Sequence, residues 1–230
     1  GMIRSPEFAN QVLANKQADF IFLGRSLLAD PEWVSKARQD KVRDIRPCIS
    51  CNQCIENNFK GQGVRCTVNP VTGRENIFLK KAEIKQSARA VVIGGGPAGM
   101  QAALSLRRHG LEVILYDREP YLGGFMALAA VPPHKKRVVA WRDYMVRELD
   151  QSGVEVSLNN HVTRDLLMRI KPDVLVLATG AEATHPFIEG GDHSTCIEAV
   201  DVLAGKVDLS AQEVVVIGGG STGCEGAEFL

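Results

Sequence analysis

Four cysteines in a short stretch have the spacing of ligands to an inorganic centre. Cys48, Cys51, Cys54 and Cys66 follow the pattern C-x2-C-x2-C-x11-C. Ligation by four thiolates suits a [4Fe–4S] cluster or a structural zinc ion. Zinc sites usually combine two C-x-x-C hooks, whereas here three cysteines are serial and the fourth stands alone. We therefore interpret the stretch as a cluster loop, with zinc and unmetallated thiols as the alternatives.

A glycine-rich turn is the second feature with chemical meaning. An apolar strand, Ala90 to Ile93, is followed by G-x-G-x-x-G and a predicted helix from Met100 to Arg108. The glycines of the pattern are Gly94, Gly96 and Gly99. They permit a tight turn, a close approach of the backbone to a pyrophosphate, and close contact of helix and strand. A second strand, Glu112 to Tyr116, ends at Asp117, where an acid can bind a ribose hydroxyl. This order predicts dinucleotide binding, with an ordinary glycine turn as the alternative.

The pattern recurs near the end of the chain. Residues 213–230 read as another strand, another G-x-G-x-x-G and the beginning of a helix. Its glycines are Gly218, Gly220 and Gly223. No second strand or acid follows, so we expect this parallel sheet to be incomplete at the C-terminus.

Between the two turns, a strand over Val174 to Leu177 ends in Ala178, Thr179 and Gly180. Such small residues are typical of the chain crossing beside a flavin nucleotide in two-dinucleotide flavoproteins. A plain turn at the end of the strand is the alternative.

The elements around these residues follow an α/β order. We predict a helix over Pro6 to Asn15 with Ser5 as its N-cap, and a short strand over Asp19 to Leu23. Gly24 and Arg25 follow that strand and could hold a phosphate, although a simple turn is the alternative.

Two further elements are predicted later in the chain. Helical spacing extends over Lys135 to Gln151, and its aromatic residues are expected in the core rather than at a cofactor. A strand is predicted over Val154 to Leu158. Cys196 and Cys224 stand apart from the other cysteines, and we expect both to be buried as small apolar residues.

Composition limits the classes of function. Of the 230 residues, 45% are hydrophobic and 23% charged, and the 27 basic residues balance the 27 acidic ones. This balance argues against a nucleic-acid or membrane partner, and no apolar run is long enough for a bilayer. No secretory signal is present at the start, and the cysteines do not form a disulfide framework. We expect a cytoplasmic protein with a small-molecule substrate, a description compatible with a homo-oligomer.

The order of motifs resembles a known family. LGRSLLADPEW, PCISCNQC, VVIGGGPAGM, DVLVLATGA and VVIGGGSTGCE resemble the NADH:flavin oxidoreductases of the 2,4-dienoyl-CoA reductase and enoate reductase type. That family includes trimethylamine and histamine dehydrogenases and bile-acid oxidoreductases. In it, a TIM barrel with FMN precedes a [4Fe–4S] loop, an FAD domain and an NAD(P)H domain.

The resemblance implies an α/β fold in four parts. Residues 1–45 would be the C-terminal remnant of the FMN barrel, and residues 46–86 the cluster loop and a connector. Residues 87–181 would be a Rossmann-like FAD-binding domain with a parallel sheet. Residues 182–230 would be a connector and the start of the NAD(P)-binding domain. The 230 residues are thus expected to be a fragment of a longer protein.

The resemblance also implies the roles of individual residues. The cluster would be held by Cys48, Cys51, Cys54 and Cys66. The FAD pyrophosphate would be bound by Gly94, Gly96, Pro97, Ala98 and Gly99, its ribose by Asp117, and the rest of that nucleotide by Gly124, Val162, Thr179 and Gly180. The FMN phosphate would be bound by Gly24 and Arg25, and NAD(P)H by Gly218, Gly220 and Gly223. Asp117 stands where glutamate is usual, and Arg118 follows it. Because an arginine there suits a 2′-phosphate, NADP is an alternative ligand of the first fold.

The implied activity is that of an iron–sulfur flavoenzyme. Electrons would pass from NAD(P)H to FAD, through the [4Fe–4S] cluster to FMN, and reduce an activated C=C bond of an enoate, a dienoyl-CoA or an enone. The 230 residues alone are expected to bind FAD or ADP without turning over substrate. One alternative is an amine dehydrogenase that holds ADP in the FAD fold. Another is a non-catalytic electron-transfer subunit, which should carry further cysteine sets.

Overall fold

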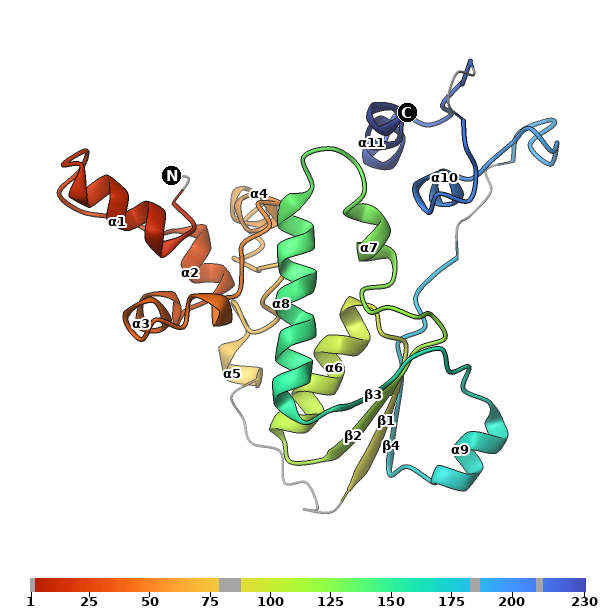
Figure 1. Ribbon diagram of the computed structural model, residues 1–230, viewed down its shortest axis with the longest axis horizontal. Coiled ribbons are helices and arrows are strands. Elements are labelled where there is room, and N and C mark those ends of the chain that lie inside the picture. The colour runs from red at the N-terminus through yellow and green to blue at the C-terminus, as the bar shows by residue number, and fades with distance from the viewer. Residues whose placement is uncertain (1–2, 79–87, 183–186, 210–212) are drawn as a thin grey trace.

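A four-stranded parallel sheet forms the centre of the protein (Figure 1). The structure, a computed structural model, describes residues 3–78, 88–182, 187–209 and 213–230. The strands lie in the order β3-β2-β1-β4 and are β1 (Arg89–Ile93), β2 (Glu112–Tyr116), β3 (Glu155–Ser157) and β4 (Val174–Leu177). In register, Ala90 of β1 lies between Val113 of β2 and Val174 of β4. The predicted α/β fold with a parallel sheet is confirmed, and all four strands lie within one residue of their predicted bounds.

Two helices cover one face of the sheet. These are α6 (Pro97–Arg108) and α8 (Lys136–Ser152), which pack against each other (Figure 1). Trp141 and Tyr144 of α8 are buried in the core, as its aromatic spacing predicted. Helix α6 begins earlier than predicted because Pro97 occupies its first turn, where the missing N–H costs no hydrogen bond. The short α7 (Phe125–Ala129) and α9 (Arg164–Ile170) follow β2 and β3.

The N-terminal part is a chain of short helices beside α8 (Figure 1). They are α1 (Pro6–Ala14), α2 (Arg25–Ala29), α3 (Trp33–Arg38), the 3-10 helix η1 (Val42–Asp44), α4 (Gln53–Phe59) and α5 (Glu75–Phe78). Ser5 caps α1 as expected, with its hydroxyl accepting from the N–H of Phe8 at 3.2 Å. Ala29 and Val68 belong to the same buried core as α6 and α8, and Cys48 and Cys66 pack against it. The cysteine region therefore shares a core with the nucleotide-binding fold.

Two predicted strands are not formed. Residues 19–23 and 213–217 pair with no strand in the described ranges, and Phe20 and Val215 are 89% and 87% exposed. The apolar residues favour an extended chain, but a strand also needs a neighbour to receive its hydrogen bonds. The predicted strand from residue 154 to residue 158 is shortened to β3.

The C-terminal part carries α10 (Ala199–Leu203) and α11 (Ser221–Phe229). The expectation that Cys196 and Cys224 are buried is wrong, because both are exposed. Their thiols approach the carbonyls of Gly190 and Gly219 at 3.5 and 3.6 Å. Among the described helices, none has the length and apolar character needed to cross a membrane.

Candidate functional site

All four predicted cluster ligands line one cavity. Cys48, Cys51, Cys54 and Cys66 share its wall with Arg25 and a few neighbouring residues. In the described part of the chain, no three His, Cys, Asp or Glu side chains come close enough together to hold a single metal ion. The fold thus brings thiols from two sections of the chain to one cavity, without placing three of them within reach of a single ion.

The backbone of the cysteine loop is tightly wound. Ser50 and Asn52 have φ values of +59° and +61°, and Asn52 is the N-cap of α4, which carries Cys54. The Ser50 hydroxyl is buried and lacks a hydrogen-bond partner within the described residues. A buried polar atom without a partner is costly, and this one directly precedes Cys51 in the chain. Four thiols are the donor set that an iron–sulfur cluster uses, so the chemistry of the cavity lining fits such a cluster.

Polar groups also surround the individual thiols. The Sγ of Cys51 lies 3.1 Å from the Thr67 hydroxyl. Burial raises the pKa of the Cys66 thiol, whereas backbone N–H groups of Val68 and Asn69 lower it by bonding to the sulfur. Such N–H···S bonds stabilise thiolates and tune the potential of a cluster.

The first glycine turn has the geometry that its sequence predicted. Gly94 has φ +108°, and a Cβ there would lie 2.2 Å from the carbonyl oxygen of Ala178. A Cβ on Gly99 would lie 1.7 Å from the carbonyl oxygen of Gly94. Around Gly96, the N-cap of α6, a Cβ would meet no atom within 4 Å. The first and third glycines thus allow close contacts, while the second borders open space at the helix N-terminus. Pro97 and Ala98 open that helix.

The predicted nucleotide residues gather at the C-terminal ends of the strands. Ala178 N donates to the carbonyl of Ile93 at 2.8 Å, which brings Thr179 and Gly180 beside the turn. A Cβ on Gly124 would lie 3.2 Å from the Cα of Gly96. This edge between β1 and β4 is where the strand order reverses, the usual position of a nucleotide in such sheets. Val162 lies between β3 and α9.

Asp117 is already engaged with the backbone. Its carboxylate accepts from the N–H of Gly95 within the glycine turn and from the N–H of Glu119 at 2.8 Å. The acid thus supports the glycine turn from the position where a ribose is predicted. Arg118 points to solvent and lies 3.4 Å from Glu119.

The second glycine turn repeats the local shape of the first. Gly218 has φ +112°, and a Cβ on Gly223 would lie 1.8 Å from the carbonyl of Gly218. A Cβ on Gly220 would meet nothing within 4 Å. An ion pair between Lys135 and Glu225 joins its helix α11 to the chain before α8, and Nε2 of His134 lies 3.8 Å from the Glu228 carboxylate.

Gly24 and Arg25 lie at the start of α2, beside the cysteines. Gly24 is the N-cap of α2, and the Arg25 guanidinium donates to the side-chain oxygen of Asn52. No motif marks Asn52, so the sequence analysis did not select it. A predicted phosphate-binding residue is thus joined to the cysteine loop.

Several known oxidoreductases are similar to this chain. The family model described as pyridine nucleotide-disulphide oxidoreductase matches residues 88–230. The whole chain is 45% identical to 36% of the length of an NADH oxidase from Thermoanaerobacter brockii. It is 36% identical to 34% of a cinnamate reductase from Clostridium sporogenes, again over its whole length. The chain therefore spans about a third of these relatives.

A solved structure is similar over nearly the whole chain. It is a 2-naphthoyl-CoA reductase in complex with 2-naphthoyl-CoA, with a TM-score of 0.86 and 28% identity. The match covers 98% of this chain and 34% of the reductase. The cysteine region and the nucleotide fold thus occur together in that reductase as well.

Proposed function

Because the chain belongs to the pyridine nucleotide-disulphide oxidoreductase family, we propose that it is the cluster-binding and nucleotide-binding part of an NAD(P)H-dependent iron–sulfur flavin oxidoreductase. The electron path would run from NAD(P)H through FAD and a [4Fe–4S] cluster to FMN. The acceptor would be an activated C=C bond. The cinnamate and 2-naphthoyl-CoA reductases support a conjugated acyl substrate, because both are named for one.

The single observation that carries the proposal is the cavity lined by all four cysteines beside the core of the nucleotide fold. When bound, the cluster and the flavins supply the electron transfer. The residues of this chain supply position. Cys48, Cys51, Cys54 and Cys66 would hold the cluster, and N–H groups near Cys66 would stabilise its thiolate.

The nucleotide would lie over the first glycine turn. The open space at Gly96 would admit the pyrophosphate to the N-terminus of α6, whose free N–H groups and dipole favour an anion. Asp117 would bind the ribose, and Gly124, Thr179 and Gly180 would line the rest. The second turn, at Gly218, Gly220 and Gly223, would face NAD(P)H, and Gly24 with Arg25 would hold the FMN phosphate.

Purification under anaerobic conditions tests the proposal. We expect about four iron and four sulfide per chain, a broad absorbance near 400 nm, and FAD among the released nucleotides. A protein with stoichiometric zinc and no iron would contradict the cluster. Release of ADP without flavin absorbance would instead favour an amine dehydrogenase of the kind that holds ADP in this fold.

A further inference from the structure

Buried polar side chains are concentrated in one small region. Of the described polar residues, those classed as buried are Ser26, Asp30, Asn69 and Thr72, with 7%, 4%, 3% and 8% exposure. Ser26 and Asp30 belong to α2 and the residue that follows it, and Asn69 and Thr72 follow Cys66. Burying polar groups is costly unless they are hydrogen-bonded, and a bonded network fixes one geometry. Its position beside the cysteine cavity calls for an explanation.

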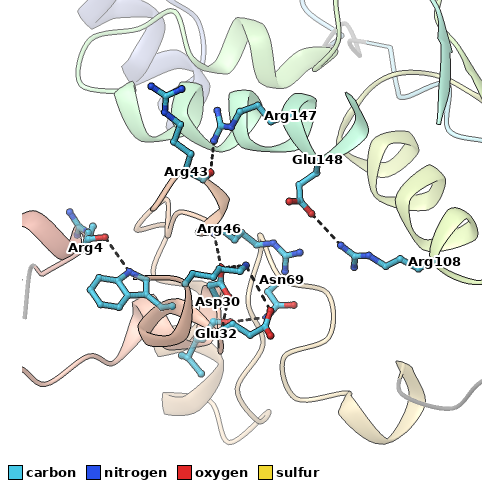
Figure 2. A network of polar contacts seen from close by, with 12 residues as sticks. Arg4, Asp30, Glu32, Arg43, Arg46, Asn69, Arg108, Arg147 and Glu148 are labelled. Atoms are coloured by element: carbon cyan, nitrogen blue, oxygen red, sulfur yellow. Dashed lines mark hydrogen bonds and ion pairs between the residues drawn. The ribbon is translucent and has the colours of Figure 1, made fainter. Parts of the chain in front are cut away.

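Asp30 is the centre of this network (Figure 2). Its Oδ2 accepts from the backbone N–H of Arg46 at 2.8 Å and from the Lys36 ammonium at 2.8 Å. Its Oδ1 accepts from the N–H of Glu32 at 3.0 Å. Arg46 lies two residues before Cys48, so the carboxylate holds the chain where it enters the cysteine segment.

The same short helix holds the other sections of that segment. The Leu28 carbonyl accepts from the Asn69 amide at 3.1 Å and from the Thr72 hydroxyl at 2.7 Å, just beyond Cys66. At its other end, Arg25 donates to Asn52, between Cys51 and Cys54. One helix and the residue after it thus contact the chain before, within and after the four cysteines.

The network also reaches the nucleotide fold (Figure 2). The Arg46 guanidinium lies 5.6 Å from the centre of the Tyr144 ring on α8. Arg147, one turn further along α8, donates to the carbonyl of Arg43 at 2.9 Å. The cysteine segment is therefore held between α2 on one side and α8 on the other.

The geometry points to α2 and Asp30 as a clamp that holds the segment carrying the four cysteines in place around its cavity, with Asp30 as its positioning residue. This inference rests on the proposed function, because it concerns the retention of the proposed cluster. The clamp begins at Arg25, the predicted flavin-phosphate residue, so it fixes that residue relative to the cysteines. Asp30 acts through backbone N–H groups and touches no cysteine itself.

The rate at which the cluster-loaded protein releases iron measures how firmly the clamp holds the cysteine segment. We expect Asp30→Asn to release iron to a ferrous chelator at least tenfold faster than the wild type, because an amide has one acceptor where the carboxylate uses two. The EPR spectrum of the reduced cluster should also change, which a general loss of stability would not produce. Thr72→Val removes one bond without removing a charge, and we expect a smaller acceleration of the same kind.

A matched control separates the clamp from surface charge. Glu32→Gln removes an exposed carboxylate 4.0 Å from the same lysine, Lys36, and should leave both measurements unchanged. If Asp30→Asn does not fold, Thr72→Val decides. Wild-type rates and spectra in the variants that fold would overturn the clamp, whereas a wild type that holds no iron would overturn the proposed function itself.

Discussion

The two glycine turns have nearly the same local geometry and very different surroundings. Gly94 and Gly218 have φ values of +108° and +112°, and Gly99 and Gly223 both approach the carbonyl of the first glycine. The first turn is embedded between β1, β2 and β4, with Ala178 pressed against Gly94. Before the second turn, the described residues supply no neighbouring strand, and Val215 and Ile217 are exposed.

This difference separates what a motif specifies from what the fold specifies. The G-x-G-x-x-G pattern determines a tight turn and the start of a helix from local sterics alone. The strand before the turn forms only where other strands accept its hydrogen bonds. Equivalent substitutions in the two turns should therefore have unequal effects.

The largest difference is expected at the third glycine. In Gly99→Ala, the new methyl group would lie against the Gly94 carbonyl inside a rigid sheet, at a cost of about 3–5 kcal/mol of unfolding free energy. Gly223→Ala meets the same clash where the preceding chain can move, so the cost should be about 1 kcal/mol or less. Urea denaturation followed by circular dichroism measures both. Equal losses would show that the surroundings do not matter.

A similar contrast applies to the first glycine. Gly94→Ala combines backbone strain at positive φ with a clash against Ala178, for a loss of about 3 kcal/mol. Gly218→Ala has strain alone, because no atom lies within 4 Å of the new Cβ, and should cost about 1 kcal/mol. The same denaturation measurement applies. A loss at Gly218 as large as that at Gly94 would contradict the role given to Ala178.

Tyr144, on the helix α8 that packs against α6, makes the stability of the nucleotide fold depend on pH. Burial raises the pKa of this tyrosine from 10.0 to about 12. Because the folded pKa lies above the unfolded one, its contribution is complete below pH 10 and is lost as the pH rises towards 12. The loss should be about 2–3 kcal/mol. Urea denaturation at several pH values should show a steeper decline in the wild type than in Tyr144→Phe, and parallel curves would refute the assignment.

Substitution of the second glycine should have the smallest effect on stability, so its effect on nucleotide binding is measured instead. Gly96→Ala places a methyl group in open space, so stability should change by less than about 1 kcal/mol. Its affinity for ADP should fall at least about tenfold, or 1.4 kcal/mol, because the methyl group blocks the pyrophosphate. Calorimetric titration with ADP measures this. Gly220→Ala is the matched control and should leave the affinity for ADP unchanged. An equal loss of affinity in this variant would contradict the assignment of ADP to the first turn.

Much of the nucleotide fold could be predicted from the sequence. The apolar runs that became β1, β2 and β4, and the aromatic spacing of α8, depend on periodicities that short segments carry themselves. The same reasoning failed for residues 19–23 and 213–217, because pairing depends on chain that lies elsewhere. Cys196 and Cys224 were misjudged for a related reason, since burial depends on neighbours that no local pattern reveals.

The candidate site was predictable only where a motif marks it. The spacing of the four cysteines identified residues that the fold brings to one cavity. Asp30 and Asn52 had no such signal, because their roles arise from contacts with residues distant in the chain, such as Arg46 and Arg25. Sequence patterns thus indicate groups that bind cofactors, but not the groups that hold them in place.

The core shared by Ala29, Val68 and the helices α6 and α8 has a consequence for dividing this protein into modules. A cut between the cysteine segment and the nucleotide fold would expose buried apolar surface on both pieces. The boundary suggested by motifs therefore does not coincide with a unit that can be transplanted. Transferring the four cysteines to another scaffold would therefore also require the buried face of α8, which contributes to the same core.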